Sequence, residues 1–215
     1  MKNQFDLIIF DWDGTLINSI DWITQSLQQA ALAYGFPIPE AQAAKDVIGL
    51  SIENAVLTLF PEANELTQVH LANSYRDHYS SKQLGRGDLF PGVYDMLVHL
   101  KQSGYQLAVA TGKTRSGLQA ALLGTATEDL FCMTRCADET ASKPDPKMLL
   151  EIIEQTQTPK ERCVMVGDSV FDLQMAQNTP ISSIAVSCGA QPPELLQRYQ
   201  PLLCLQQPTE LLNYI

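Results

Sequence analysis

The sequence is poor in basic residues, and this bounds the kinds of partner that the protein can bind. It holds 14 Lys and Arg against 24 Asp and Glu among 215 residues, which gives a net charge of −10 at pH 7. Nucleic acids and anionic membrane surfaces attract clustered positive charge. We therefore expect neither as a partner, and an anionic substrate would need a site that supplies its own positive charge.

The sequence also lacks long apolar runs and regularly spaced cysteines. No apolar stretch approaches the roughly 18 residues typical of a membrane span, and Met1–Gln4 leads into the first apolar run without a signal-like segment. The five cysteines form no C-x-x-C pair, and several lie in apolar runs, so we expect buried free thiols. These absences predict a soluble, cytoplasmic protein.

What the sequence does have is an apolar run at residues 5–10 that ends in Asp11, Trp12 and Asp13. Its content of Ile, Leu and Phe, without alternation, is typical of a strand buried on both faces of a parallel sheet. Successive side chains of an extended chain point in opposite directions, so Asp11 and Asp13 share one side. Two carboxylates this close predict a Mg²⁺ site or a shared proton. Residues 16–20 lack the further ligands of a calcium loop.

After this acidic loop the periodicity is helical up to about residue 83, and strands then alternate with helices. The pattern predicts helices over 18–34, 40–48, 52–60 with Ser51 as N-cap, and 65–80. Further strands are predicted at 105–110, 131–136, 162–166, 183–186 and 202–205, and a helix near residue 146 is expected to be capped by Asp145. The fold class is therefore α/β, a doubly wound, mostly parallel sheet with a small all-helical insertion after the first strand.

Polar residues with possible chemistry follow three more of these strands. The hydroxyl of Thr111 and the backbone N–H groups of Gly112 and Lys113 could bind a phosphoryl oxygen, although Thr-Gly is also ordinary strand-to-helix punctuation. Lys143, held between Ser142 and a proline-rich segment, is either a fixed cation or a solvated lysine.

The fourth strand is followed by two more aspartates. Asp168 is placed to complete a metal shell with Asp11, because carboxyl ends of parallel strands meet at one edge of a sheet. Asp172 is either a residue that orients this shell or an acidic residue in the first turn of a helix.

This series of Asp-x-Asp, Thr, Lys and Asp at four strand ends resembles the motifs of the haloacid dehalogenase superfamily of phosphatases. Asp-Trp-Asp-Gly-Thr at residues 11–15 is similar to its first motif, Thr111 to its second, Lys143 to its third, and residues 167–172 to its fourth. The helical insertion resembles the cap of phosphoglycolate phosphatase-like members. The resemblance implies a Rossmann-like core at residues 1–16 and 85–215 and a helical cap at residues 17–84.

The resemblance also implies an activity: Mg²⁺-dependent hydrolysis of small-molecule phosphate monoesters, phosphoglycolate phosphatase-like. Asp11 would attack phosphorus to give an aspartyl-phosphate, and Asp13 would be the general acid and base. The implied metal residues are Asp11, Asp13 through its backbone carbonyl, Asp168 and Asp172. The implied substrate-binding residues are Thr111, Gly112, Lys143 and, from the cap, Lys45, for which a solvated helix lysine is the alternative. The expected partner is a small phosphorylated metabolite, and the expected state a monomer or homodimer.

Some positions depart from the family pattern, and other activities stay open. Gly112 and Lys113 stand where the family often has Asn after Thr, and Thr179-Pro180 replaces a frequent Ala-Gly pair. A β-phosphoglucomutase-like phosphotransferase shares the four motifs, a phosphonatase would need a cap lysine such as Lys45, and a catalytically silent binding protein would keep the fold. A haloacid dehalogenase is disfavoured because Asp13 is present. Arg115 is placed to contact a substrate carboxylate or cap a helix; Arg76 and the three histidines (70, 78 and 99) are assigned to the surface or to packing.

Overall fold

The computed structural model describes residues 4–215, so Met1, Lys2 and Asn3 of the predicted N-terminal segment lie outside the described residues. Its centre is a six-stranded sheet in the order β3-β2-β1-β4-β5-β6, in which every neighbouring pair is parallel. The strands are β1 (Leu7–Phe10), β2 (Gln106–Thr111), β3 (Met133–Cys136), β4 (Cys163–Gly167), β5 (Ser182–Val186) and β6 (Leu203–Leu205). The predicted α/β class and its six strands are confirmed.

Helices cover both faces of this sheet, which explains why β1 is apolar throughout. Ile8 and Phe10 point into one hydrophobic cluster, while Leu7 and Ile9 point into another on the opposite face. The first face is covered by α5 (Val93–Gln102), α6 (Arg115–Thr125) and the 3₁₀ helix η5 (Pro208–Asn213); the second is covered by α7 (Lys147–Thr156) and α8 (Val170–Asn178). Short helices η2 (Glu128–Leu130), η3 (Lys160–Arg162), α9 (Pro193–Leu196) and η4 (Gln197–Tyr199) complete the connections.

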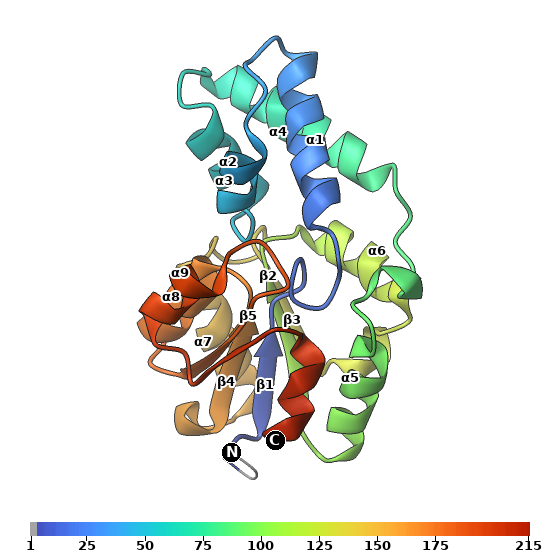
Figure 1. The fold of residues 1–215 in the computed structure, drawn as a ribbon, viewed down its shortest axis with the longest axis vertical. Coiled ribbons are helices and arrows are strands. Elements are labelled where there is room, and N and C mark those ends of the chain that lie inside the picture. The colour runs from blue at the N-terminus through green and yellow to red at the C-terminus, as the bar shows by residue number, and fades with distance from the viewer. Residues whose placement is uncertain (1–3) are drawn as a thin grey trace.

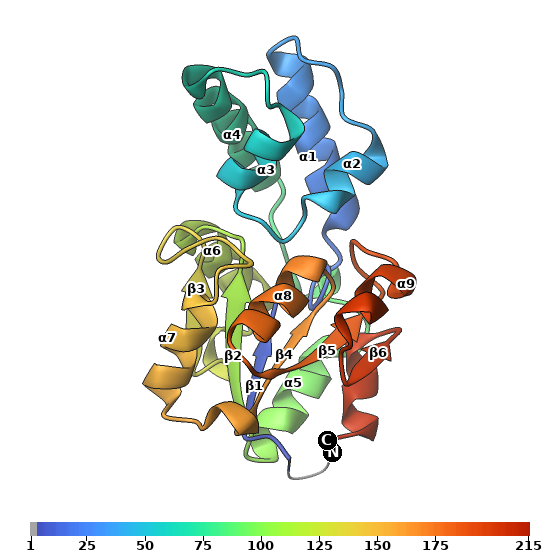
Figure 2. The same cartoon turned by 90° about the vertical axis from the view of Figure 1, so that its left-hand side faces the viewer.

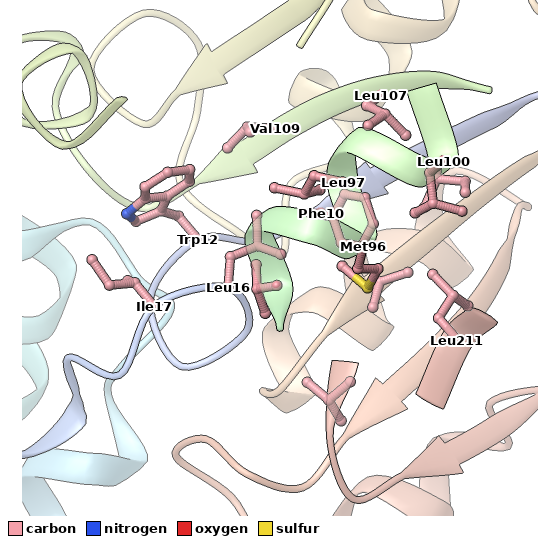
Figure 3. Close-up of a cluster of buried hydrophobic side chains, with 14 of the residues drawn as sticks. Phe10, Trp12, Leu16, Ile17, Met96, Leu97, Leu100, Leu107, Val109 and Leu211 are labelled. Atoms are coloured by element: carbon pink, nitrogen blue, oxygen red, sulfur yellow. The ribbon is translucent and has the colours of Figure 1, made fainter. Parts of the chain in front are cut away.

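Trp12 anchors the acidic loop in the first of these clusters. Figure 3 shows its indole beside Val109 and Ile17, next to the group formed by Phe10, Leu97 and their neighbours. The side chain is fully buried, and the ring of Phe131 meets it edge-on at a centroid distance of 6.2 Å. With Trp12 held in the core, the aspartates on either side of it face away from the core, as predicted.

Four helices stand over the carboxyl edge of the sheet, in the upper part of Figures 1 and 2. We call them the cap helices: α1 (Ile20–Ala33), α2 (Ala41–Asp46), α3 (Ile52–Leu59) and α4 (Glu65–Ser80). Their predicted bounds are correct within a few residues, and Ser51 caps α3, its Oγ accepting a hydrogen bond from Asn54 N at 3.3 Å. The chain returns to the sheet through η1 (Arg86–Asp88). The division into domains at residues 16/17 and 84/85 stays a prediction.

Two local predictions need correction. Helix α7 begins at Lys147, with Pro146 at the N-cap position, one residue later than predicted; Asp145 still caps the first turn, since its Oδ1 accepts a hydrogen bond from Lys147 N at 2.9 Å. Of the cysteines, which were expected to be buried, Cys136 and Cys163 are buried, Cys188 and Cys204 are half-buried, and Cys132, which precedes the edge strand β3, is exposed. Among residues 4–215, no helix is long and apolar enough to cross a membrane.

Candidate active site

Three buried aspartates meet at the carboxyl edge of the two central strands. Asp11 follows β1, and Asp168 and Asp172 follow β4, which is the neighbour of β1 in the sheet. One carboxylate oxygen from each lies within 4.8 Å of the others, and all three side chains are buried. The pairing of β1 with β4 thus brings together residues more than 150 positions apart, as the sequence predicted.

Glycines let the backbone close around Asp168. Its Oδ1 accepts a hydrogen bond from Thr15 Oγ1 at 2.8 Å, and its Oδ2 accepts one from Ala190 N at 2.7 Å. A Cβ atom on Gly14 or Gly189 would lie 2.3 Å or 2.1 Å from Asp168 Oδ2. Gly14 also has φ +78°, a conformation that side chains rarely adopt. The glycine after the acidic pair is therefore required by close approach and by backbone conformation.

Lys143 contacts two of the three aspartates, and it is the one lysine among residues 4–215 that is paired with them. Its Nζ lies 2.6 Å from Asp11 Oδ1 and 2.6 Å from Asp172 Oδ1, and the ammonium is fully buried. The other oxygen of Asp172 accepts hydrogen bonds from Ser169 Oγ at 2.7 Å and Ser169 N at 3.1 Å. Asp172 is thus fixed on both sides and orients the lysine toward Asp11. Of the two alternatives for Lys143, a fixed cation and a solvated lysine, its burial agrees with the fixed cation.

The charges of this group are not balanced by the described residues. Burial, together with repulsion from Asp172 and Asp168, raises the pKa of Asp11 well above its usual range, although Lys143 opposes the shift. Burial and the charge of Asp172 raise the pKa of Asp168 to about 7. Burial lowers the pKa of Lys143, but the attraction of Asp11 and Asp172 outweighs it and the net shift is upward. The lysine therefore stays charged, and excess negative charge remains.

This group fits a divalent cation. Asp11 Oδ1 is buried and, among the described residues, has the ammonium of Lys143 at 2.6 Å as its polar partner, while Asp168 and Asp172 crowd the same space. A cation between Asp11 and Asp168 would relieve the repulsion that raises both pKa values. Mg²⁺ prefers a few carboxylate oxygens completed by water and substrate. The carboxylate of Asp13 lies outside the group, so only its backbone carbonyl is left for the predicted metal role.

The Asp13 side chain belongs to a second cluster, which joins the acidic loop to the cap. Its Oδ1 accepts hydrogen bonds from Ser19 Oγ at 2.7 Å and from Tyr79 Oη at 3.2 Å, and its Oδ2 lies 2.9 Å from Lys113 Nζ. Lys113 also donates a hydrogen bond to Tyr79 Oη at 2.8 Å and lies 4.2 Å above the Tyr79 ring. Burial and the charge of Asp13 raise the pKa of Tyr79, so its hydroxyl keeps its proton.

These partners of Asp13 were missed by sequence reasoning. Lys113 was noted as a departure from the family pattern, but only its backbone N–H was given a role. That extra cation directly after Thr-Gly was a usable signal. Tyr79 gave none, because its contact depends on the end of α4 folding back over the acidic loop, 66 residues away.

A cavity of about 290 Å³ lies between the acidic loop and the cap helices. Asp11, Asp13, Thr111 and Gly112 line it from the sheet side, so the structure brings four predicted site residues to one space. Lys143, Asp168 and Asp172 lie behind Asp11 and do not line it.

Three cations are placed differently from what the sequence suggested. Lys45 does not line the cavity, and its Nζ lies 4.0 Å from Asp21 on the cap. Arg115 pairs with Glu139 and does not line the cavity either. Arg76, assigned to the surface or to packing, does line it, because α4 turns this side of its last turns toward the sheet.

The cap lies in direct contact with the loops of the sheet. A Cβ atom on Gly112 would lie 2.4 Å from the carbonyl oxygen of Leu50, so glycine is required for this approach. The N–H of Ser51 donates a hydrogen bond to Ser142 Oγ at 2.8 Å, beside Lys143. The cap therefore closes over the end of β2 and over the segment that carries the buried lysine.

A parallel α/β sheet with a buried acidic group at its carboxyl edge, a lysine against it and a helical cap above it defines a class of enzyme that handles phosphorylated compounds. The chain belongs to the haloacid dehalogenase-like hydrolases, whose family model matches residues 8–186. It is a phosphatase of this family.

The chain is similar to several known proteins along most of its length. It is 31% identical to the protein named "Probable phosphatase IndB" of Dickeya dadantii, over 91% of this chain and 86% of that one. It is 30% identical to a phosphoglycolate phosphatase of Agrobacterium fabrum, over 85% and 81% of the two chains. A solved haloacid dehalogenase-like hydrolase from Bacteroides fragilis has the same fold, with a TM-score of 0.88, 22% identity and coverage of 96% and 99%.

Proposed function

We propose that this phosphatase is a Mg²⁺-dependent hydrolase of small-molecule phosphate monoesters and that it works through an aspartyl-phosphate on Asp11. The observation that carries the proposal is the position of Asp11, which lines the cavity while Lys143 and the acidic group hold it from behind. A buried carboxylate facing a substrate-sized space, with Asp13 beside it, fits a nucleophile paired with a general acid.

The proposed reaction has two halves. In the first, a carboxylate oxygen of Asp11 attacks phosphorus, the bond between phosphorus and the ester oxygen breaks, and Asp13 gives its proton to the departing alcohol. In the second, Asp13 takes a proton from water, the resulting hydroxide attacks phosphorus, and the bond to Asp11 breaks to release inorganic phosphate. Asp13 thus ends each cycle protonated, ready for the next ester.

The remaining site residues would stabilise the negative charge of the phosphoryl oxygens. Thr111 and Gly112 line the cavity, and the Thr111 hydroxyl and the Gly112 N–H would donate to phosphoryl oxygens, while Lys143 supplies a fixed positive charge next to Asp11. Asp172 acts by positioning Lys143.

Asp11, Asp168 and the backbone carbonyl of Asp13 would hold Mg²⁺. The bound ion neutralises charge between the carboxylate nucleophile and the anionic substrate. The proposal is supported by the three carboxylates that meet within 4.8 Å and by the raised pKa values of Asp11 and Asp168.

The alternatives named from the sequence receive less support. A phosphonatase would use a cap lysine as a Schiff base, but Lys45 lies outside the cavity, and the cap helices contribute no lysine to the described cavity lining. Phosphoglycolate is the substrate named for several relatives and is the other candidate. A β-phosphoglucomutase-like transfer would appear as phosphate moved between hydroxyl groups without net release.

The test is phosphate release by purified protein from a panel of phosphate esters, with Mg²⁺ and after chelation. Asp11→Asn is the test variant, and Asp21→Asn, which changes an exposed cap residue, is the matched control. Release that needs both Mg²⁺ and Asp11 supports the proposal. Undiminished release by Asp11→Asn, or after chelation, would contradict it.

A further inference from the structure

We propose that the natural substrate is the phosphate ester of an apolar alcohol, alkyl or aromatic, without a second anionic group. This inference rests on the proposed function, since it assigns the leaving group of the same reaction. Three observations support it: the cavity wall opposite the acidic loop is apolar, the cations that line the cavity are paired, and the cavity is larger than a small acid needs.

The wall that the cap presents to the cavity is apolar. Residues from three elements share this wall, on one face of α1, at the end of α2 and on α3: Ile23, Leu27, Val47, Ile48, Ile52 and Ala55. The charged and hydroxyl-bearing cap residues of the lining other than the tyrosines, Arg76, Asp77 and Ser80, all come from the last turns of α4, and Asp77 and Ser80 are exposed. An alcohol that leaves from the phosphoryl group therefore enters apolar surroundings, where each buried hydroxyl or charge of its own would need a partner.

Two tyrosines complete this wall. The rings of Tyr75 and Tyr79 stack with centroids 5.7 Å apart, and both line the cavity. The hydroxyl of Tyr79 is already used by Asp13 and Lys113, and its ring packs against Tyr75 and under Lys113, so Tyr79 offers the cavity ring carbon and no unpaired hydroxyl. Aromatic faces of this kind bind apolar and planar groups better than charged acids.

The cations near the cavity are already paired. Among residues 4–215, two cations line it, Lys113 and Arg76. Lys113 lies against Asp13, and Arg76 pairs with Glu53 and with the side-chain oxygen of Asn73. A substrate carboxylate or second phosphate would have to compete with the carboxylates of Asp13 and Glu53, and Asp77 in the lining would repel it.

The cavity is also larger than a small acid requires. Its volume of about 290 Å³ approaches the roughly 300 Å³ at the lower end of small-molecule sites. A phosphoryl group with a two-carbon acid fills part of this space and leaves the apolar wall without contacts. A longer alkyl chain or an aromatic ring would cover it.

The experiment compares kcat/KM for methyl, propyl, hexyl and phenyl phosphate with that for phosphoglycolate, glycerol phosphate and glucose 6-phosphate, all with Mg²⁺. We expect kcat/KM to rise about fourfold for each added methylene until the cavity is filled. We also expect hexyl and phenyl phosphate to exceed phosphoglycolate by at least about tenfold. Binding of hexylphosphonate and phosphonoacetate, measured by calorimetry, should give the same ranking without turnover.

A variant pair tests whether the cap wall makes this selection. Ala55 lines the cavity, so Ala55→Leu should reduce the ratio of hexyl to methyl phosphate hydrolysis several-fold by filling the space. Ala43→Leu makes the same change on exposed surface of α2 and should leave the ratio as in the wild type.

The outcomes separate this inference from the proposed function. Preference for phosphoglycolate or a sugar phosphate, with Mg²⁺-dependent release intact, would overturn the inference alone. Release from no ester would overturn the proposed function. The binding of the two phosphonates would then still test the selection of apolar groups. Tighter binding of phosphonoacetate than of hexylphosphonate would overturn the inference as well.

Discussion

Lys113 and Asp13 form a nearly buried ion pair, with Nζ 2.9 Å from Oδ2 and side-chain exposures of 7% and 13%. Tyr79, in the last turn of α4, forms a hydrogen bond with each partner. The proposed general acid is therefore positioned by the residue that departs from the family pattern after Thr111 and by a residue of the cap.

Replacing this lysine should slow turnover more than it weakens substrate binding. In Lys113→Met the carboxylate of Asp13 keeps its hydrogen bonds from Ser19 and Tyr79 but loses the ion pair that fixes its Oδ2. We expect kcat to fall by about tenfold or more, since general acid catalysis contributes about 10²–10⁴-fold. Lys147→Met, at an exposed site on α7, is the control, and kcat equal to the control would contradict the assigned role.

Adding a single methyl group where the cap meets the sheet should impair activity without unfolding the protein. Gly112→Ala would place a Cβ 2.4 Å from the Leu50 carbonyl oxygen and push the cap loop away from the cavity. We expect kcat/KM to fall by about tenfold to 100-fold, because small displacements at a reacting site are costly. Gly87→Ala meets nothing within 4 Å and should behave as the wild type. Steady-state kinetics and a thermal melt of both variants would check this, and equal kinetics would contradict it.

The metal-free protein should lose stability through Asp168 as pH rises. The pKa of Asp168 is raised to about 7 by burial and by Asp172, so the folded state binds a proton that the unfolded chain has lost. Its contribution to stability therefore falls between pH of about 4, near the pKa of an unfolded Asp, and about 7. In Asp168→Asn this trend should disappear.

Melting temperatures of chelated wild-type and Asp168→Asn protein, compared from pH 5 to pH 8, measure this difference. We expect the variant to gain stability relative to the wild type as pH rises. A difference that stays constant with pH, or runs the other way, would show that Asp168 is ionised in the metal-free fold. Asp145→Asn, at an exposed site before α7, serves as the control.

Removing the metal should abolish turnover and lower stability together. A cation that binds only the folded protein adds about 2.7 kcal/mol to the free energy of unfolding at 100 times its Kd. We expect Mg²⁺ to raise the melting temperature more at pH 8 than at pH 5, because the acidic group is more fully charged at the higher pH. Equal shifts at both pH values, or equal shifts in Asp168→Asn, would place the ion elsewhere.

The fold and the acidic group could be predicted because their determinants are local. The unbroken apolar run of β1 marks a strand buried on both faces, and strand order in a parallel sheet then brings Asp11 and Asp168 to one edge. The capping of α3 by Ser51 follows from a similarly short segment, whereas the two alternatives for Lys143 were decided only by its distant partners Asp11 and Asp172.

The rest depends on how the cap packs against the sheet, which no short pattern records. Tyr79 reaches Asp13 only because α4 runs back along α1 to the acidic loop, and Arg76 reaches the cavity for the same reason. Lys45 stands on a helix whose orientation turns it toward Asp21 and away from the cavity.

The most direct test of the proposed mechanism is to trap the phosphoenzyme. The protein is mixed with labelled ester and Mg²⁺, quenched in acid during turnover, reduced with borohydride, and digested for mass spectrometry. A phosphorylated Asp is converted to homoserine by this reduction, so we predict homoserine at position 11 in wild-type protein. Asp11→Asn should show none. In Asp13→Asn the homoserine yield falls where formation of the phosphoenzyme is slowed more, and it rises where hydrolysis of the phosphoenzyme is slowed more. Modification at another residue, or none while phosphate is released, would contradict the account.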